Sequence, residues 1–189
     1  MSERSIQLAL LVEDQYQVLE VWYPYYRLQE EGIKVKIIGT GTKEIYHSKE
    51  GYPVKVDAAI QDVKAKDFDG VIIPGGYAPD FLRRYETIVN FVKRLYIDGR
   101  VVAAICHGGW LLVSAGILKG HKVTCFFAIK DDLIAAGGKY VDRDVVVDKN
   151  LITSRKPDDL PRFVQEIILL SSGSANLGKA LDIIPQRSE

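Results

Sequence analysis

Short, continuous apolar runs alternate along this chain with segments of helical periodicity, and no other feature constrains the fold as strongly. Three such runs occupy residues 8–12, 71–73 and 101–105. Strands that are buried on both faces have this composition, which is typical of parallel sheets. The helical segments between them, such as residues 18–31, fit the crossover connections of such a sheet. The pattern predicts an α/β fold, a three-layer α/β/α sandwich with a mostly parallel sheet.

Local signals place the remaining elements. The helix at 18–31 stops at Gly32, and residues 35–38 follow as a second strand. Residues 52–56 alternate like a strand of an antiparallel excursion, and residues 145–147 and 151–153 resemble a hairpin. The other expected elements are a short strand at 123–125 and helices at 80–95, 110–118, 129–136 and 157–170, the last with Pro157 in its first position.

Cys106 stands where the apolar run of residues 101–105 meets His107, Gly108 and Gly109. In open parallel sheets, ligands bind beyond the carboxyl ends of the strands. The glycines permit a sharp turn, and the helical segment that follows places the thiol near a helix N-terminus, which favours the thiolate. Such a strand–nucleophile–helix elbow carries the reactive residue in several hydrolase folds. The alternative is a buried structural cysteine, because free cysteines are among the most buried residues.

Composition excludes several classes of function. The 189 residues carry 25 Lys and Arg against 25 Asp and Glu, so no charge excess indicates nucleic acid or a membrane surface as a partner. No apolar stretch approaches the ~20 residues that span a bilayer, and we expect no signal peptide. Two cysteines do not make a disulfide framework, which predicts a reducing, cytoplasmic setting.

The residue pattern gives no support for a metal or cofactor site. His47, His107 and His121 are scattered without ligand spacing, so we expect no metal. Pro74-Gly75-Gly76 lacks the Lys-Ser/Thr of a P-loop, and no GxGxxG turn follows the first strand, so we expect no cofactor. α/β-Hydrolases and glutamine amidotransferases place the catalytic histidine well after the nucleophile. Since no histidine follows His121, the sequence argues against both.

Several short motifs, in their order and spacing, resemble the ThiJ/PfpI family from about residue 6 to residue 170. They are Tyr23-Pro24-Tyr25-Tyr26-Arg27-Leu28-Gln29-Glu30-Glu31-Gly32, Pro74-Gly75-Gly76-Tyr77-Ala78-Pro79-Asp80, Ala104-Ile105-Cys106-His107-Gly108, Ile129-Lys130-Asp131-Asp132, and Ser154-Arg155 followed by Pro157. The resemblance implies a flavodoxin-like sheet, a homodimer or trimer of dimers, and a cysteine on a strained elbow. We expect one ThiJ/PfpI-like domain at 1–170 and a C-terminal extension of unknown role at 171–189.

The resemblance also implies roles for four side chains. Cys106 matches the family's nucleophile, and Glu20 matches a buried glutamate that hydrogen-bonds the thiol. A protonated Glu20 would donate to the thiolate, whereas an ionised one would oppose it. His107 matches the histidine that PfpI-like members carry after the cysteine and is the expected base. Asp80 matches an acidic residue, usually Glu, that reaches the histidine of a neighbouring subunit; alternatively, it caps the helix after Pro79.

Backbone groups and two aromatic side chains complete the predicted site. Gly75, Gly76 and Gly108 would supply N–H groups to an oxyanion, or would only permit turns. Tyr77 and Phe126 are candidates for the pocket. Phe126 is also a departure from the family pattern, because PfpI-like proteins often have an active-site tyrosine at this position.

The chemistry expected of these residues is attack of a thiolate on a carbonyl carbon. Our first hypothesis is a cofactor-free, stress-protective enzyme, similar to a glyoxalase III or a deglycase, that acts on small reactive carbonyls or their protein adducts. The alternatives are a PfpI-type intracellular cysteine protease or amidase, and a non-catalytic redox sensor or chaperone-like protein whose exposed, low-pKa thiol oxidises readily. The expected partners are a carbonyl or peptide substrate, with no nucleic acid and no membrane.

Overall fold

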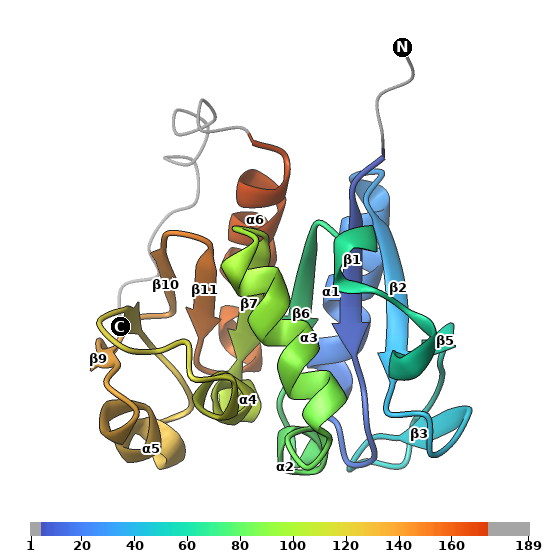
Figure 1. Cartoon of the computed structure of the whole chain (residues 1–189), viewed down its shortest axis with the longest axis horizontal. Coiled ribbons are helices and arrows are strands. Elements are labelled where there is room, and N and C mark those ends of the chain that lie inside the picture. The colour runs from blue at the N-terminus through green and yellow to red at the C-terminus, as the bar shows by residue number, and fades with distance from the viewer. Residues whose placement is uncertain (1–4, 174–189) are drawn as a thin grey trace.

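The described part of the chain, residues 5–173 of a computed structural model, is arranged around a mostly parallel sheet of seven strands (Figure 1). The strands lie in the order β10-β11-β7-β6-β1-β2-β5, with the bounds β1 Gln7–Leu11, β2 Lys34–Gly39, β5 Ala58–Ala59, β6 Gly70–Ile73, β7 Val101–Ile105, β10 Val145–Asp148 and β11 Leu151–Ser154. Neighbours pair in parallel, except for the antiparallel hairpin of β10 and β11 at one edge. The predicted α/β class and the predicted hairpin are therefore confirmed.

Helices cover both faces of the sheet, as a three-layer sandwich requires. Their bounds are α1 Val18–Glu30, α2 Ala78–Leu82, α3 Glu86–Ile97, α4 Gly109–Ala115, α5 Lys130–Ala135 and α6 Leu160–Ser171. Figure 1 shows α3 and α4 in front of the sheet, with α1 and α6 behind it.

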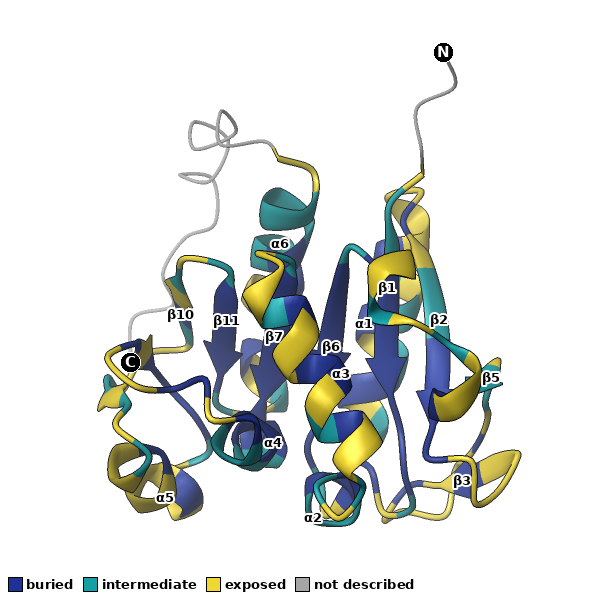
Figure 2. Ribbon diagram, viewed as in Figure 1, coloured by how far each residue is buried: buried dark blue, intermediate teal, exposed yellow. Residues whose placement is uncertain are grey.

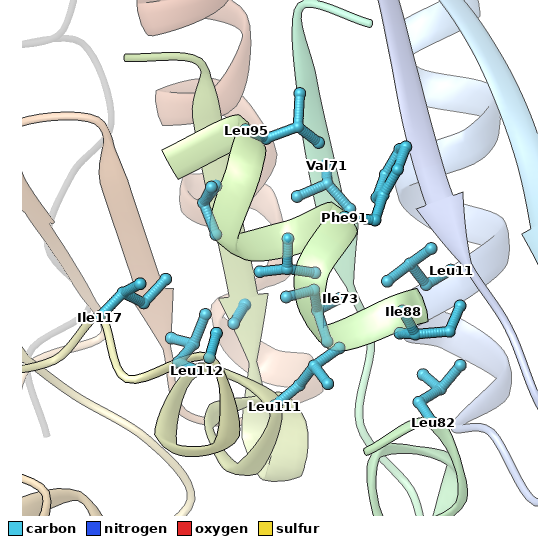
Figure 3. Close-up of a cluster of buried hydrophobic side chains, with 14 of the residues drawn as sticks. Leu11, Val71, Ile73, Leu82, Ile88, Phe91, Leu95, Leu111, Leu112 and Ile117 are labelled. Atoms are coloured by element: carbon cyan, nitrogen blue, oxygen red, sulfur yellow. The ribbon is translucent and has the colours of Figure 1, made fainter. Parts of the chain in front are cut away.

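Strand residues alternate between the two faces of the sheet, and each face packs on its own helices. In β1, Leu8 and Leu10 join a cluster that includes Val21 of α1 and Phe163 of α6. Leu11 belongs to the cluster on the opposite face, together with side chains of β6, β7, α3 and α4 (Figure 3). Because helices cover both faces, the central strands are almost wholly buried (Figure 2). This burial explains why they stand in the sequence as continuous apolar runs.

Within the described residues, two small sheets lie beside the main one. β3 (Ile45–His47) and β4 (Pro53–Lys55) pair antiparallel, which confirms the excursion predicted at 52–56. No strand is predicted at the position of β3. β8 (Lys122–Val123) and β9 (Lys139–Tyr140) pair in parallel, so the strand predicted at 123–125 is shorter and begins one residue earlier. Strands of two residues have no periodicity to detect in a sequence.

Three predicted helices have the wrong bounds. Segment 80–95 holds two helices, α2 and α3, because Tyr85 between them is extended, with φ −103° and ψ 110°. The helix predicted at 110–118 ends at Ala115, since Gly116 adopts the left-handed conformation with φ 69°. The last helix, α6, begins at Leu160, and Pro157 instead opens one turn of 3₁₀ helix.

The predicted extension at 171–189 lies almost wholly outside the described residues, which end at 173. Its role therefore stays open. In the part of the chain that is described, no helix is long and apolar enough to cross a membrane.

Candidate active site

The carboxyl ends of three neighbouring strands bring the predicted site residues together. β6 leads into Gly75 and Gly76, and β7 leads directly into Cys106. The segment after β1 leads into α1, which carries Glu20 in its first turn. Because β1, β6 and β7 are parallel neighbours, their carboxyl ends meet at one edge of the sheet. The fold thus places at one edge residues that are far apart in the sequence.

Cys106 sits on a strained elbow. Its φ is 59°, in the left-handed region that few non-glycine residues occupy. One turn of 3₁₀ helix (Cys106–Gly108) follows, and α4 begins immediately after it. Gln15, with φ 62°, is a second such residue, and its carbonyl accepts a hydrogen bond from the N–H of Tyr77 at 2.9 Å. Strain of this kind persists where surrounding contacts hold it and is common at functional sites.

Two glycines allow the backbone segments at this edge to approach closely. A Cβ atom on Gly108 would lie 2.5 Å from the carbonyl oxygen of Ile73, so no larger residue fits there without displacing β6. Gly76 has φ 74°, and a Cβ atom on it would overlap the Gln15 carbonyl. Both glycines are therefore required by geometry, whatever their N–H groups do.

Glu20 is a buried carboxyl group beside the thiol. It has no solvent exposure, its Oε2 accepts the Gly75 N–H at 2.6 Å, and its Oε1 has no hydrogen-bond partner among the described residues. A Cβ atom on Gly75 would lie 2.7 Å from Cβ of Cys106 and 2.8 Å from Oε2 of Glu20, so Gly75 lies between the two side chains. Burial raises the pKa of Glu20 to about 7, against the lowering effect of the Gly75 N–H. The prediction that Glu20 is buried is confirmed.

The thiol of Cys106 is protonated at neutral pH. The residue is 8% exposed, and burial, followed by the charge of Glu20, raises the pKa of the thiol to about 12. Hydrogen bonds from the backbone N–H groups of His107 and Gly76 lower the pKa of the thiol, but by less than burial raises it. Desolvation of the sulfur outweighs the neighbouring N–H groups, contrary to the expectation that a helix N-terminus favours the thiolate of this cysteine.

His107 lies against the thiol of the same chain. Its Nδ1 is 3.3 Å from Sγ of Cys106, and the side chain is half-buried. Burial, and after it the positive charge of Lys49, lowers the pKa of His107 below its usual value of 6.5. The imidazole is therefore neutral at pH 7 and able to accept a proton.

The other predicted residues surround this pair at different distances. The Phe126 ring stacks on the imidazole of His107 at 5.1 Å between centroids, and Tyr77 lies farther away, at 6.4 Å. Asp80 of α2 pairs with Arg84, just beyond the end of this helix, rather than with the histidine of its own chain. It is the third residue of α2, whose N-cap is Tyr77, so the alternative that Asp80 caps this helix is wrong.

The three glycine N–H groups divide between different partners. That of Gly75 donates to Glu20, and that of Gly76 reaches the sulfur of Cys106. Gly108 stands at the N-cap of α4 and packs on β6. Of the three, only Gly76 offers an N–H beside the reacting atom, and its role toward an oxyanion stays a prediction.

Sequence reasoning missed three residues that shape the site. Gln17 caps α1, its Oε1 accepting the Glu20 N–H at 2.9 Å. Lys49 comes from a polar loop between β3 and β4, and nothing in that loop's sequence relates it to the thiol. Trp110 packs edge-on against His107 at 5.0 Å. The three-residue spacing of Trp110 and His107 at the start of a helix is the one signal that could have indicated their contact.

Within residues 5–173, no three His, Cys, Asp or Glu side chains are grouped so that they could hold a metal ion. The candidate site consists instead of a thiol, an imidazole, a carboxyl group and backbone N–H groups.

Comparison with known proteins identifies the family of this chain. Residues 7–170 match the DJ-1/PfpI family. The chain belongs to the DJ-1/PfpI family. The DJ-1/PfpI match covers the residues from β1 to α6 and confirms the ThiJ/PfpI resemblance.

Relatives of this chain have the names of enzymes, and two of them show the range. Deglycase PfpI of Pyrococcus furiosus is 41% identical over 165 residues, which cover 87% of this chain and 99% of the relative. The putative cysteine protease YraA of Bacillus subtilis is 41% identical over 166 residues, which cover 88% of this chain and 98% of the relative. These names support an enzyme of the PfpI type.

A solved structure shows the same architecture. It is a two-domain protein from Anabaena variabilis with DJ-1/ThiJ/PfpI-like and ferritin-like domains, similar at a TM-score of 0.88 and 37% sequence identity. The match covers 96% of this chain and 52% of that chain, so this chain spans about half of the two-domain protein. The agreement confirms the predicted α/β architecture.

Proposed function

We propose that this protein is a cysteine-dependent, cofactor-free enzyme that acts on small reactive carbonyls or on their adducts with proteins, and thereby protects against carbonyl stress. The observation that carries the proposal is the contact of a neutral imidazole with a protonated thiol: Nδ1 of His107 lies 3.3 Å from Sγ of Cys106. A relative named deglycase, 41% identical, supports the choice of reaction.

The first step is addition of the sulfur to the aldehyde carbon of a 2-oxoaldehyde such as methylglyoxal. Because the resting thiol is protonated, it needs a base, and neutral His107 takes its proton while the S–C bond forms. The carbonyl oxygen becomes an alkoxide, which the protonated His107 then neutralises to give a hemithioacetal. Oε2 of Glu20 accepts an N–H, so a proton on this carboxyl belongs on Oε1. The side chains of Glu20 and Cys106 interact, and a protonated carboxyl group would stabilise a thiolate there.

The second step rearranges the hemithioacetal without any external oxidant. A base removes the proton from the former aldehyde carbon, and a proton is delivered to the neighbouring carbonyl carbon. One carbon is oxidised and the other reduced, which gives a thioester of a 2-hydroxy acid. Water hydrolyses the thioester, so that lactate and the free thiol are the products from methylglyoxal.

Turnover of methylglyoxal by the wild type and by Cys106→Ser tests the proposal, with lactate measured as product and protein mass recorded under excess substrate. We expect multiple turnovers that vanish in the variant. Stoichiometric modification of Cys106 without lactate would refute it.

A peptidase is the second candidate, because a relative of 41% identity is named a putative cysteine protease. Here Sγ of Cys106 would attack an amide carbon, and protonated His107 would give its proton to the leaving amine. Cleavage of a fluorogenic peptide that depends on Cys106, in the absence of lactate formation, would favour this reading. The redox-sensor hypothesis relied on an exposed thiol of low pKa, and Cys106 is neither exposed nor of low pKa.

Assembly and location are part of the same proposal. A homodimer or trimer of dimers would allow Asp80 of one subunit to reach His107 of another, and a reducing cytoplasm would keep Cys106 free. Light scattering of the purified protein tests whether it forms a homodimer or a trimer of dimers.

A further inference from the structure

Aromatic side chains surround the imidazole of His107. Phe126 stacks on the imidazole with an interplanar angle of 29° at 5.1 Å, whereas Trp110 meets it edge-on, at 70° and 5.0 Å. Tyr77 lies 6.4 Å from the same ring. Together with Phe127, whose ring is 4.6 Å from that of Phe126, these residues are called the aromatic rim.

The outer members of the aromatic rim face solvent. Phe127 is 69% exposed and Tyr77 is 57% exposed. Phe127 follows Phe126 directly, and Tyr77 follows Gly76, whose N–H reaches the sulfur of Cys106. Aromatic rings thus extend from His107, which contacts the thiol, through Phe126 to the exposed ring of Phe127. Exposed aromatic rings that border a reactive group form a binding surface of the kind that ligand sites use.

Charged groups contact Trp110 of the aromatic rim, whereas the ring of Phe127 stays exposed. The indole N–H of Trp110 donates to Asp132 at 2.7 Å. The Arg83 guanidinium lies over the Trp110 ring, 5.9 Å from its centroid, and also donates to Ser114 at 2.9 Å. These contacts fix the indole, whereas Phe127 offers an apolar ring and no hydrogen-bonding group.

We propose that the aromatic rim is a specificity subsite that selects carbonyl substrates whose substituent beside the reacting carbonyl is aromatic, in preference to methylglyoxal. The proposal rests on the proposed function in one respect, namely that Cys106 is the nucleophile. A phenyl group on a carbonyl bound to Sγ would lie against Phe126 and Phe127, where offset or edge-on ring contacts are favourable. Ring contacts of this strength change a rate constant by about three- to tenfold.

The test compares kcat/KM for phenylglyoxal and methylglyoxal in the wild type, Phe127→Ala and Phe127→Leu. We expect the phenylglyoxal-to-methylglyoxal ratio to fall about three- to tenfold in Phe127→Ala and by less in Phe127→Leu, which keeps apolar bulk. Ile97→Ala removes a comparably exposed apolar side chain (63%) at the end of α3 and should leave the ratio unchanged.

A second readout separates failure of the subsite from failure of the proposed function. Bromoacetone and 2-bromoacetophenone alkylate a cysteine as sulfur displaces bromide, with the thiol proton lost to a base, and intact mass reports the rate at Cys106. If neither glyoxal is turned over, the proposed function fails, and the subsite is still tested by the ratio of the two alkylation rates. A fall of this ratio in Phe127→Ala supports the subsite.

Two results would overturn the subsite. One is an unchanged ratio in both readouts for Phe127→Ala and for Tyr77→Ala. The other is an unchanged ratio together with a smaller assembly by light scattering, which would assign the aromatic rim to a contact between copies of this chain.

Discussion

Replacing Glu20 with Gln should make the protein more stable at alkaline pH, although it removes a residue of the candidate site. The carboxyl group is wholly buried, and burial raises its pKa from 4.5 to about 7. The folded state therefore holds the proton more tightly than the unfolded state does. Stability from this group is fully present below pH 4.5 and is lost as the pH rises through 7.

The size of the effect follows from the pKa values. The pKa of Glu20 is about 2.5 pH units higher in the folded state than in the unfolded state, and one unit corresponds to about 1.4 kcal/mol. At a pH where the carboxyl group is ionised in both states, this difference lowers the free energy of unfolding by about 3.4 kcal/mol. Between pH 5 and pH 8 the free energy of unfolding should fall by about 2.5 kcal/mol from this group alone. A glutamine has nearly the same shape, and its side-chain oxygen can accept the Gly75 N–H that Oε2 of Glu20 accepts. Glu20→Gln should therefore lack this part of the pH dependence.

Urea unfolding of the wild type and of Glu20→Gln at pH 5 and pH 8 measures this difference directly. Subtracting one protein's pH dependence from the other's cancels titrations that the two share, including that of His107. Glu30→Gln on the same helix is the matched control, because Glu30 is exposed and should behave as the wild type does. Equal pH dependence in the wild type and Glu20→Gln would refute the assignment of a buried, proton-binding carboxyl group.

Two further predictions concern the backbone and the charge at the site. Gly76→Ala should lower the free energy of unfolding by about 2–4 kcal/mol, because the new methyl group meets the Gln15 carbonyl in a left-handed conformation. Gly51→Ala has a similar φ, 87°, but open space, so urea unfolding should show a cost of only about 1–2 kcal/mol. Lys49→Met removes a charge that lowers the pKa of His107, so the acid limb of the kcat/KM profile should move to higher pH. Lys49→Arg keeps the charge and should leave the acid limb where it is in the wild type. An equal shift of the acid limb in both variants would show that the charge is not the cause.

The alternation of strands and helices and the place of the elbow could be predicted from the sequence because local composition marks both. Burial on both faces makes β1, β6 and β7 almost entirely apolar, and the Cys-His-Gly-Gly segment after β7 marks the elbow. The break between α2 and α3 had no such signal, since no proline or glycine marks it and only the extended conformation of Tyr85 does.

The candidate site was predictable only in part. Cys106 follows from its place in the sequence, whereas Glu20 emerged from the family resemblance, because α1 shows no reason of its own to bury a carboxyl group. Lys49 acts on His107 through space, from a loop between β3 and β4 that is remote in sequence. The raised pKa of the thiol could not be predicted for the same reason. A helix N-terminus is visible in a sequence, but the burial of the sulfur is set by residues that only the fold assembles.

Several costly features of this protein lie in contact with one another. Cys106 holds a left-handed conformation, Gly75 leaves no room for a Cβ atom between Cys106 and Glu20, and Glu20 raises the thiol pKa while its own carboxyl is buried. The left-handed backbone of Cys106 and the buried carboxyl group of Glu20 each lower the stability of the folded state. A chain selected for stability alone would not keep them together. Glu20→Gln should therefore gain stability at pH 8 and lose carbonyl turnover. A variant that gained stability and kept its turnover would show that the buried carboxyl group has no part in the chemistry.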